Sequence, residues 1–332
     1  MNNTEEIIQA VIVGVTVAYF LSNTNRVLKS IEICKESLVI LKDKTKIRGE
    51  ELVKLLYEAI YSVMLNACSV HVGNDNTYAI EYAEKCLQIC LESRDRSDKF
   101  ECELSVKLAK MYVCECNYVK AREAFERALL VSTEIGDRRT EAACYGNIGA
   151  VYQLVGEYSK AKEHLEESLA LHKDIGDRTG EASCYLNLGA VYQSVGEYGK
   201  ARKHLEKSLA INKETSNRNG EASSHAHLGA VHYSVGEYHK AGEHVQKSLA
   251  INRETGNING EASCYGNLGA VYRVVGEYNK ARELLEISLA IQNGLGDRRE
   301  AASCHAKLGT VYQSVGEYDK ASCQITCNPK RN

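Results

Sequence analysis

One stretch of sequence recurs through more than half of the chain at a fixed spacing of forty residues. Its clearest copy is Asp177–Glu214, DRTGEASCYLNLGAVYQSVGEYGKARKHLEKSLAINKE. The other copies, in the same register, are Asp137–Asp174, Asn217–Glu254, Asn257–Gly294 and the shorter Asp297–Ala321. A period between twenty and fifty residues is typical of solenoids and repeat arrays. The sequence therefore predicts a stack of similar units rather than one globular core.

The spacing of apolar residues predicts two helices in each copy. Tyr185, Leu188 and Tyr192 fall at i, i+3 and i+7, which places them on one stripe of a helix. Gly196 then marks a turn, since glycine readily adopts the positive φ found just past a helix end. Gly189 is small where the two helices would cross. The residues expected on the buried side of the second helix are Ala201, Leu205, Ser208, Leu209 and Ile211. Each copy is thus predicted to be a helical hairpin that buries its apolar faces by stacking on its neighbours.

The constant residues of each copy form three motifs, Leu188-Gly189-x-x-Tyr192, Gly196-x-Tyr198-x-x-Ala201 and Ser208-Leu209. These motifs resemble the tetratricopeptide repeat, with Tyr185 at the position usually taken by Trp. The usual unit has about thirty-four residues. The longer unit resembles the forty-residue subtype of G-protein-signalling modulators (Partner-of-Inscuteable type) and of tetratricopeptide repeat protein 28-like proteins. The resemblance implies an all-α fold, a right-handed α-solenoid of about eight repeats, with the first three degenerate and the last one clipped.

The start of the chain follows the same pattern less clearly. The apolar run Ala10–Leu21 is shorter than the roughly twenty residues that a membrane-spanning helix needs. It fits the first helix of a degenerate hairpin over residues 5–42. A second such hairpin is expected over residues 48–92. A third, over residues 100–134, returns to the strict register, with Cys116 in place of the turn glycine. The predicted domains are 1–135 (degenerate hairpins), 136–321 (repeat array) and 322–332 (a divergent tail).

Composition limits the classes of partner. The net charge is −3, with acidic and basic residues interleaved, so nothing suggests nucleic acid or an anionic membrane as a partner. No membrane insertion is expected either. The chain has thirteen cysteines, an odd number, and no cleavable signal is evident. We therefore expect a reduced, cytoplasmic protein whose thiols serve as small core residues.

No pattern of catalytic or metal-binding residues stands out. Cysteines at the shared repeat position would lie roughly 10 Å apart in a stack, too far to hold one zinc ion. His225 and His232 share one helix face and could bind a metal, yet they occupy the positions of Tyr185 and Tyr192 in the preceding copy. The favoured interpretation is that they fill the same space as these tyrosines. The sequence thus predicts no enzyme, no catalytic residue, no metal and no cofactor.

The candidate binding site is the opposite face of each first helix, which we call the amide stripe. In tetratricopeptide arrays this face lines the concave groove. An amide side chain can pair with both polar groups of an extended peptide backbone, and small neighbours such as Ala190 leave room for that peptide. The predicted groove residues are Asn147, Gln153, Asn187, Gln193, His227, Asn267, Arg273, Lys307 and Gln313. The alternative is that the asparagines pair with adjacent helices or face water.

The leading functional hypothesis is a protein-binding scaffold that holds an extended peptide of a partner. The resemblance implies a role in cell polarity, spindle orientation or G-protein signalling. One alternative is a regulatory or sensing module of a larger signalling protein whose effector domain lies elsewhere. A chaperone adaptor is less favoured, because Leu186 and Ala190 stand where such adaptors place Lys and Asn. Ser322–Asn332 makes a poor polar cap, so self-association through the C-terminal end is also expected.

Overall fold

The computed structural model describes residues 3–23, 27–43, 76–92 and 98–317, together with Ala59 and Val63. All regular elements in these ranges are α-helices, and no strand occurs in them. The chain divides into two compact units, Met1–Leu171 and His172–Asn332.

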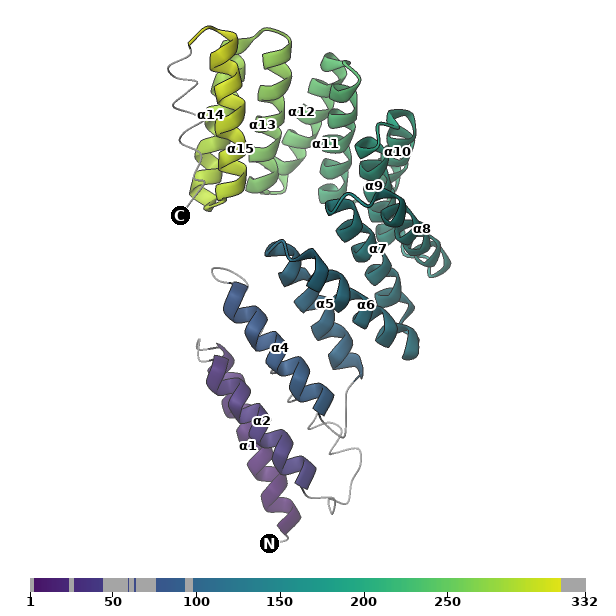
Figure 1. The fold of residues 1–332 in the computed structure, drawn as a ribbon, viewed down its shortest axis with the longest axis vertical. Helices are drawn as coiled ribbons and strands as arrows, with labels where there is room; N and C mark the ends of the chain where they lie inside the picture. Colours follow the sequence, from purple (N-terminus) through teal and green to yellow (C-terminus); the bar gives the residue numbers. More distant parts are fainter. Residues whose placement is uncertain are drawn as a thin grey trace. The chain divides into compact units, whose positions relative to one another are not determined.

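The first unit contains the helices of the N-terminal hairpins (Figure 1). They are α1 (Asn3–Asn23), α2 (Val27–Asp43), α4 (Asn76–Glu92), α5 (Asp98–Cys114), α6 (Tyr118–Glu134), α7 (Arg138–Leu154) and most of α8 (Tyr158–Asp174). α1 packs on α2, α4 on α5, α5 on α6, and α6 on α7. The helical hairpins predicted over residues 5–42 and 100–134 are therefore confirmed. The first helix and turn expected within residues 48–75 lie outside the described residues, apart from Ala59 and Val63.

The first hairpin keeps the internal spacing of the later repeats. The Ser30 hydroxyl donates a buried hydrogen bond of 2.7 Å to the carbonyl of Ala18, twelve residues earlier. Gly189 and Ala201 are also twelve residues apart, so Ala18 occupies the position of the crossing glycine. A methyl group is small enough to keep the two helices close at this point.

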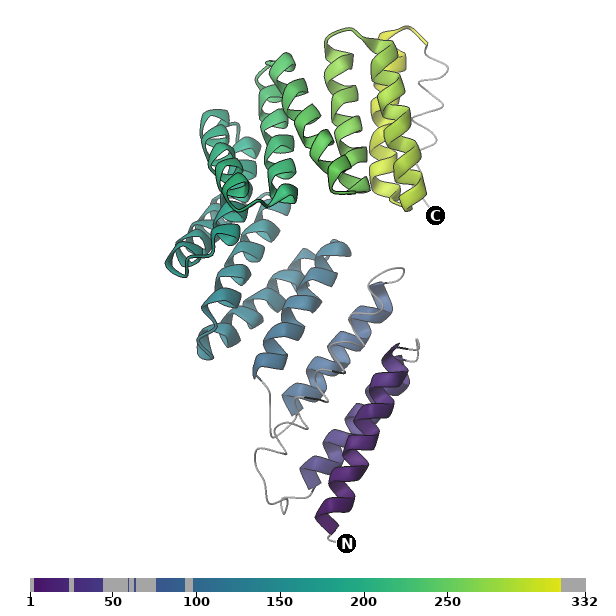
Figure 2. The same cartoon turned by 180° about the vertical axis from the view of Figure 1, so that it is seen from behind.

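The second unit repeats one hairpin several times in succession (Figures 1 and 2). After the end of α8 it contains α9 (Arg178–Ser194), α10 (Tyr198–Glu214), α11 (Arg218–Ser234), α12 (Tyr238–Glu254), α13 (Ile258–Val274), α14 (Tyr278–Leu295) and α15 (Arg298–Ser314). α9 packs on α10, α11 on α12, and α13 on α14. Each second helix also packs on the first helix of the next hairpin. This all-α solenoid is the predicted fold class.

Short polar and glycine-containing segments set the ends of the helices. The Asp177 carboxylate accepts a hydrogen bond of 3.0 Å from the backbone N–H of Gly180, which caps the start of α9. Gly196 adopts a φ of +78° after α9, as predicted for the turn. Cys116 and Ser216 hold the same left-handed conformation at φ of 56° and 54° without being glycine. The prediction that Cys116 replaces a turn glycine is confirmed.

Gly189 lets the two helices of its hairpin approach closely. A Cβ atom at this position would lie 2.6 Å from Cγ of Leu205 and 3.3 Å from the carbonyl oxygen of Ala201. The same restriction recurs at Gly149, Gly229 and Gly269. The crossing-glycine prediction is therefore confirmed, and its physical basis is contact with the second helix.

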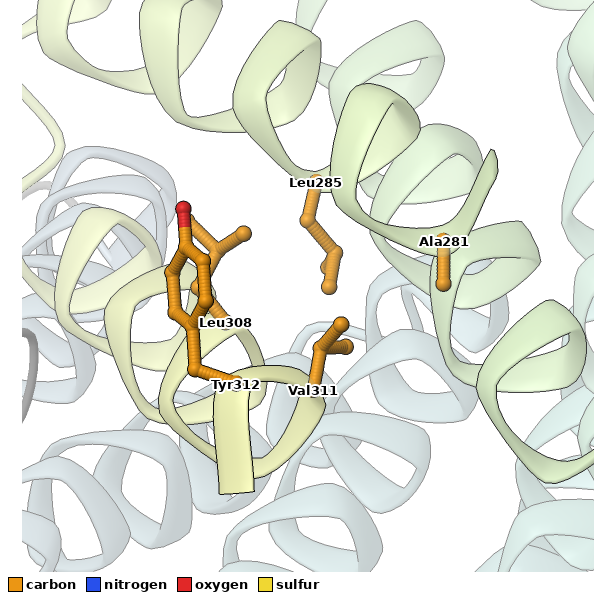
Figure 3. Close-up of a cluster of buried hydrophobic side chains, with 5 residues drawn as sticks. All are labelled: Ala281, Leu285, Leu308, Val311 and Tyr312. Carbon is orange, nitrogen blue, oxygen red and sulfur yellow. The ribbon is translucent and has the colours of Figure 1, made fainter. Parts of the chain in front are cut away.

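The last described junction between hairpins, where α15 packs on α14, has its own small core (Figure 3). Leu285 lies among Leu308, Val311 and Tyr312, all of them buried. The tail 322–332 lies outside the described residues. The three-part division into domains and the poor cap remain predictions.

Candidate functional site

The residues of each first helix separate into a buried and a partly open face. In α9, Tyr185, Leu188 and Tyr192 are buried, whereas Asn187 and Gln193 are half-buried. The other copies follow this pattern, except that Tyr145, Tyr272 and His305 are half-buried and Gln313 is exposed. The amide stripe is therefore accessible along each first helix.

The first helices of the second unit contact one another in sequence. α9 contacts α11, α11 contacts α13, and α13 contacts α15. Equivalent positions on neighbouring helices consequently form rows across this unit. One row is Asn187, His227, Asn267 and Lys307, and a second is Gln193, Tyr233, Arg273 and Gln313. The structure thus brings seven of the nine predicted residues onto one surface. Asn147 and Gln153 lie at the same positions of α7, in the first unit.

The asparagines predicted to line the groove, Asn147, Asn187 and Asn267, have no hydrogen-bond partner among the described residues. Neither Asn187 nor Asn267 makes a side-chain hydrogen bond to the described part of the chain. Asn212, on the second helix α10, behaves differently: its Nδ2 donates to Ser208 Oγ at 3.2 Å and to Ser224 Oγ at 3.3 Å. Asn212 is only 3% exposed. Within the described residues, Asn187 and Asn267 thus do not pair with adjacent helices, whereas Asn259, at the position of Thr179 and Arg299, accepts a hydrogen bond of 3.3 Å from Nε2 of Gln292 on α14.

His227 substitutes for an amide in the middle of the first row. Burial lowers the pKa of His227 below its ordinary value. At neutral pH the ring is then uncharged and offers one N–H donor and one nitrogen acceptor. This donor and acceptor pair is the same as that of an asparagine side chain.

Two residues that belong to this surface were not predicted from the sequence. Tyr233 stands in the second row, and its ring lies edge-on to Tyr238 with centroids 5.6 Å apart. Arg299 is exposed at the first-turn position of α15 that corresponds to Thr179 of α9. The repeat register alone would have identified both.

Histidines replace the tyrosines of the core in α11, as predicted. His225 and His232 are 4% and 6% exposed, so they fill the same interior space as Tyr185 and Tyr192. The sequence analysis missed their partner His244, whose Nδ1 lies 3.0 Å from Nδ1 of His225. His232 also stacks on His244, with ring centroids 5.2 Å apart. Among the described residues no group of three or more His, Cys, Asp or Glu side chains is arranged to hold a metal ion.

Eight of the ten described cysteines belong to the core, whereas Cys114 and Cys116 are exposed. The ten described cysteines are free thiols, and those at the shared repeat position, Cys144, Cys184, Cys264 and Cys304, are all buried. Burial raises the pKa of Cys144 to about 12, which keeps its thiol protonated and unreactive. No described helix has the length and apolar character that a bilayer crossing requires.

In one cavity of the first unit, polar side chains of the lining form hydrogen bonds with one another. It has a volume of about 350 Å³ and is bordered by α4, α5 and α6. The Tyr112 hydroxyl donates a hydrogen bond to the carboxylate of Glu84, and Lys120 donates to the same carboxylate at 3.1 Å. Three of the polar groups that line it are therefore already paired with one another.

Comparison with known proteins identifies the type of repeat. A family model described as the tetratricopeptide repeat matches residues 100–174, 156–214, 180–254, 219–286 and 260–325. No curated protein matches the chain significantly in sequence.

Solved structures of similar fold are distant in sequence. A Rap protein complexed with competence and sporulation factor is 13% identical, with a TM-score of 0.64 over 97% of this chain and 97% of that one. NprR in complex with its cognate peptide NprX is 14% identical, with a TM-score of 0.62 over 100% and 91%. A signal transduction ATPase with a tetratricopeptide repeat sensor, from Pyrococcus horikoshii, is 19% identical, with a TM-score of 0.60 over 92% and 52%. These likenesses are at the level of the fold.

Proposed function

The chain belongs to the tetratricopeptide repeat family, and from that premise we propose that it is a non-enzymatic scaffold that holds an extended peptide of a partner protein against the amide stripe. The observation that carries this proposal is that the side chains of Asn187 and Asn267 are accessible and unpaired within the described residues. Both lie in one row of the accessible face, on α9 and α13, and neither is bonded to the described part of the chain. An amide in this position has two donors and one acceptor available for a ligand.

The spacing of the residues within a row suits a peptide backbone. Neighbouring first helices are separated by roughly 10 Å in a helical stack. An extended chain advances about 3.3 Å per residue, so successive residues of one row would meet backbone groups about three residues apart. Ala190, Ala230 and Ala270 lie between the rows and leave space for the peptide. His227 continues the pairing pattern as a neutral ring.

The fold neighbours support a peptide as the class of ligand. NprR is described with its cognate peptide NprX, and the Rap protein with competence and sporulation factor. At sequence identities of 13% and 14%, the ligands of these two proteins are not assigned to this chain. The proposal takes from them only that a stack of this fold can receive a peptide.

The biological setting is proposed from the sequence resemblance. A cytoplasmic role in cell polarity, spindle orientation or G-protein signalling would follow from the forty-residue subtype. A second candidate is a regulatory or sensing module of a larger signalling protein. It is favoured by the Pyrococcus horikoshii neighbour, which carries a tetratricopeptide repeat sensor. The match covers 52% of that neighbour's chain.

The test uses peptides selected on the full chain from a random dodecapeptide display library. Asn187→Ala combined with Asn267→Ala should weaken the best selected peptide by about ten- to a hundredfold, with an unchanged melting temperature. The matched control is Asn279→Ala combined with Asn293→Ala, which removes two exposed asparagines of α14. Equal affinity for the wild type and the stripe variant would exclude the amide stripe as the binding face.

A further inference from the structure

Charge is distributed unevenly along the amide stripe of the second unit. On α9 and α11 the stripe residues are uncharged, for example Thr179, Asn187 and Ala230. On α13 and α15 the stripe carries three cations, which are Arg273, Arg299 and Lys307. No acidic residue occupies a stripe position on any of these four helices. The face therefore changes from neutral to cationic along the array.

Two arginines that begin first helices of this unit, Arg178 and Arg218, are neutralised by the chain itself. Arg178 contacts both Glu181 and Glu214, with a distance of 2.7 Å to the latter. Arg218 makes the equivalent pair of contacts in the next repeat. Arg273, Arg299 and Lys307, in contrast, have no ion pair within the described ranges. Three uncompensated cations on one face attract a ligand of opposite charge.

Glu300, the acidic residue of α15 nearest in sequence to Arg299, does not compensate these cations. Glu300 occupies the position of Gly260 in the preceding repeat. A Cβ at Gly260 would lie 2.4 Å from Oδ1 of Asn252, on the preceding second helix. This position is consequently directed toward the second helix, away from the amide stripe.

Lys307 is placed where it can act together with Arg273. Its Nζ lies 3.4 Å from the position that a Cβ would take at Gly266, so the ammonium group reaches from α15 onto α13. Gly266 permits this approach, whereas the equivalent residue of α9 is Leu186. Positions 266 and 273 are two helical turns apart, about 10 Å along α13. Two acidic residues about three positions apart in an extended segment would span this distance.

We infer that the partner segment is acidic where it crosses α13 and α15, and uncharged where it crosses α9 and α11. The inference rests on the proposed function and adds the chemistry of the ligand to it. Nucleic acid is the disfavoured polyanion, because the chain has a net charge of −3 and the face has only three cations beside neutral amides. A peptide carboxylate is matched in charge by single Arg and Lys side chains.

The experiment compares dodecapeptides selected on the full chain with those selected on Arg273→Glu combined with Lys307→Glu. Wild type should enrich peptides with clustered Asp or Glu, and the charge-reversed variant should enrich Lys or Arg instead. The labelled wild-type peptide should lose about tenfold or more in affinity for Arg273→Gln, Arg299→Gln and Lys307→Gln combined. The control variant Lys203→Gln, Lys247→Gln and Arg282→Gln removes the same charge from the second helices and should change the affinity less than about twofold.

The outcomes separate this inference from the function on which it rests. Selected peptides that need Asn187 and Asn267 but show no acidic enrichment would overturn the inference and keep the proposed function. A selection without binders, or with binders indifferent to both asparagines, would overturn both. Oligothymidylate of twelve nucleotides that binds as tightly as the peptides, and competes with them, would also overturn the inference.

Discussion

Nδ1 of His225 lies 3.0 Å from Nδ1 of His244, where the preceding repeat places the ring of Tyr185 beside His204. A hydrogen bond between two imidazole nitrogens needs one N–H and one bare nitrogen. If both rings are protonated, two N–H groups face each other and two positive charges adjoin. The contact is therefore compatible with neutral pH and incompatible with full protonation.

The surroundings of this histidine pair favour its neutral form. Burial is the main cause that lowers the pKa of His225, and it lowers the pKa of His244 to about 4, with His225 and His232 as further causes. Lys213 and Lys247 oppose protonation as well. Glu221, near His225, and Glu243, near His244, act in the opposite direction without reversing either shift.

These pKa shifts make the α11–α12 hairpin sensitive to acid. Because the folded pKa of His244 lies below the unfolded value near 6.5, its stabilising contribution is present above pH 6.5 and is lost as the pH falls toward 4. We expect a loss of roughly 1 kcal/mol between pH 7.5 and pH 5, after allowance for solvent screening. His225→Tyr combined with His232→Tyr should reduce this loss. Urea unfolding at both pH values measures it, with the exposed His239→Tyr as control.

An equal pH dependence in the wild type and the double tyrosine variant would contradict the prediction. Hydrogen exchange locates the effect. The amides of α11 and α12 should exchange faster at pH 5, after correction for the intrinsic rate, than those of α9 and α10.

A second prediction concerns the close approach at Gly189. Gly189→Leu should destabilise the protein by about 1–3 kcal/mol or more, because the new side chain meets Leu205 and the backbone of Ala201. Hydrogen exchange should rise mainly in α9–α12, since repeats couple to their nearest neighbours. Gly199→Leu is the control, because nothing lies within 4 Å of its Cβ position. Faster exchange spread evenly over the described helices would contradict the prediction.

A third prediction concerns the turn after α10. Ser216 adopts a φ of 54° where other repeats have glycine. Ser216→Gly should stabilise the protein by about 0.5–1 kcal/mol, because glycine adopts this conformation without steric cost. The reverse change Gly256→Ser, at the equivalent turn with a φ of 68°, should destabilise it. Melting temperatures that move in the same direction for both variants would count against this.

The fourth prediction concerns the end of the array. α15 packs on α14 and contacts α13, and among the described residues no helix follows it. Amides of Arg298–Ser314 should therefore exchange faster than those of α13 at low concentration. If the C-terminal end self-associates, this difference should shrink as the concentration rises, and sedimentation should show a dimer. A monomer with an equally protected α15 would oppose both expectations.

The repeats made much of the fold predictable from the sequence. Gly189 and Gly196 could be assigned to a crossing and a turn because each recurs in other copies with the same neighbours. The roles of Asn212 and His244 could not be assigned in this way. Their environments depend on residues of other helices, Ser224 and His225, which pack against them only in the folded stack. The position of the amide stripe on the partly open face could be predicted from helical spacing. The identity of its ligand could not, because the ligand is not part of this chain.

The buried residue at each junction between repeats has a consequence for assembly. A Cβ at Gly180 would lie 2.1 Å from His172, and one at Gly220 would lie 2.1 Å from Asn212. Near-identical repeats could in principle stack out of order. The junction residue is not the same throughout, however: it is His172 at the first junction, Asn212 and Asn252 at the next two, and Gln292 at the last. The first three face Gly180, Gly220 and Gly260. A space that accommodates a histidine side chain differs in shape from one that accommodates an asparagine. The helices at these two kinds of junction therefore fit one another by shape. The first junction is therefore distinguished by shape from the two that follow it, which disfavours an exchange of its repeats with theirs.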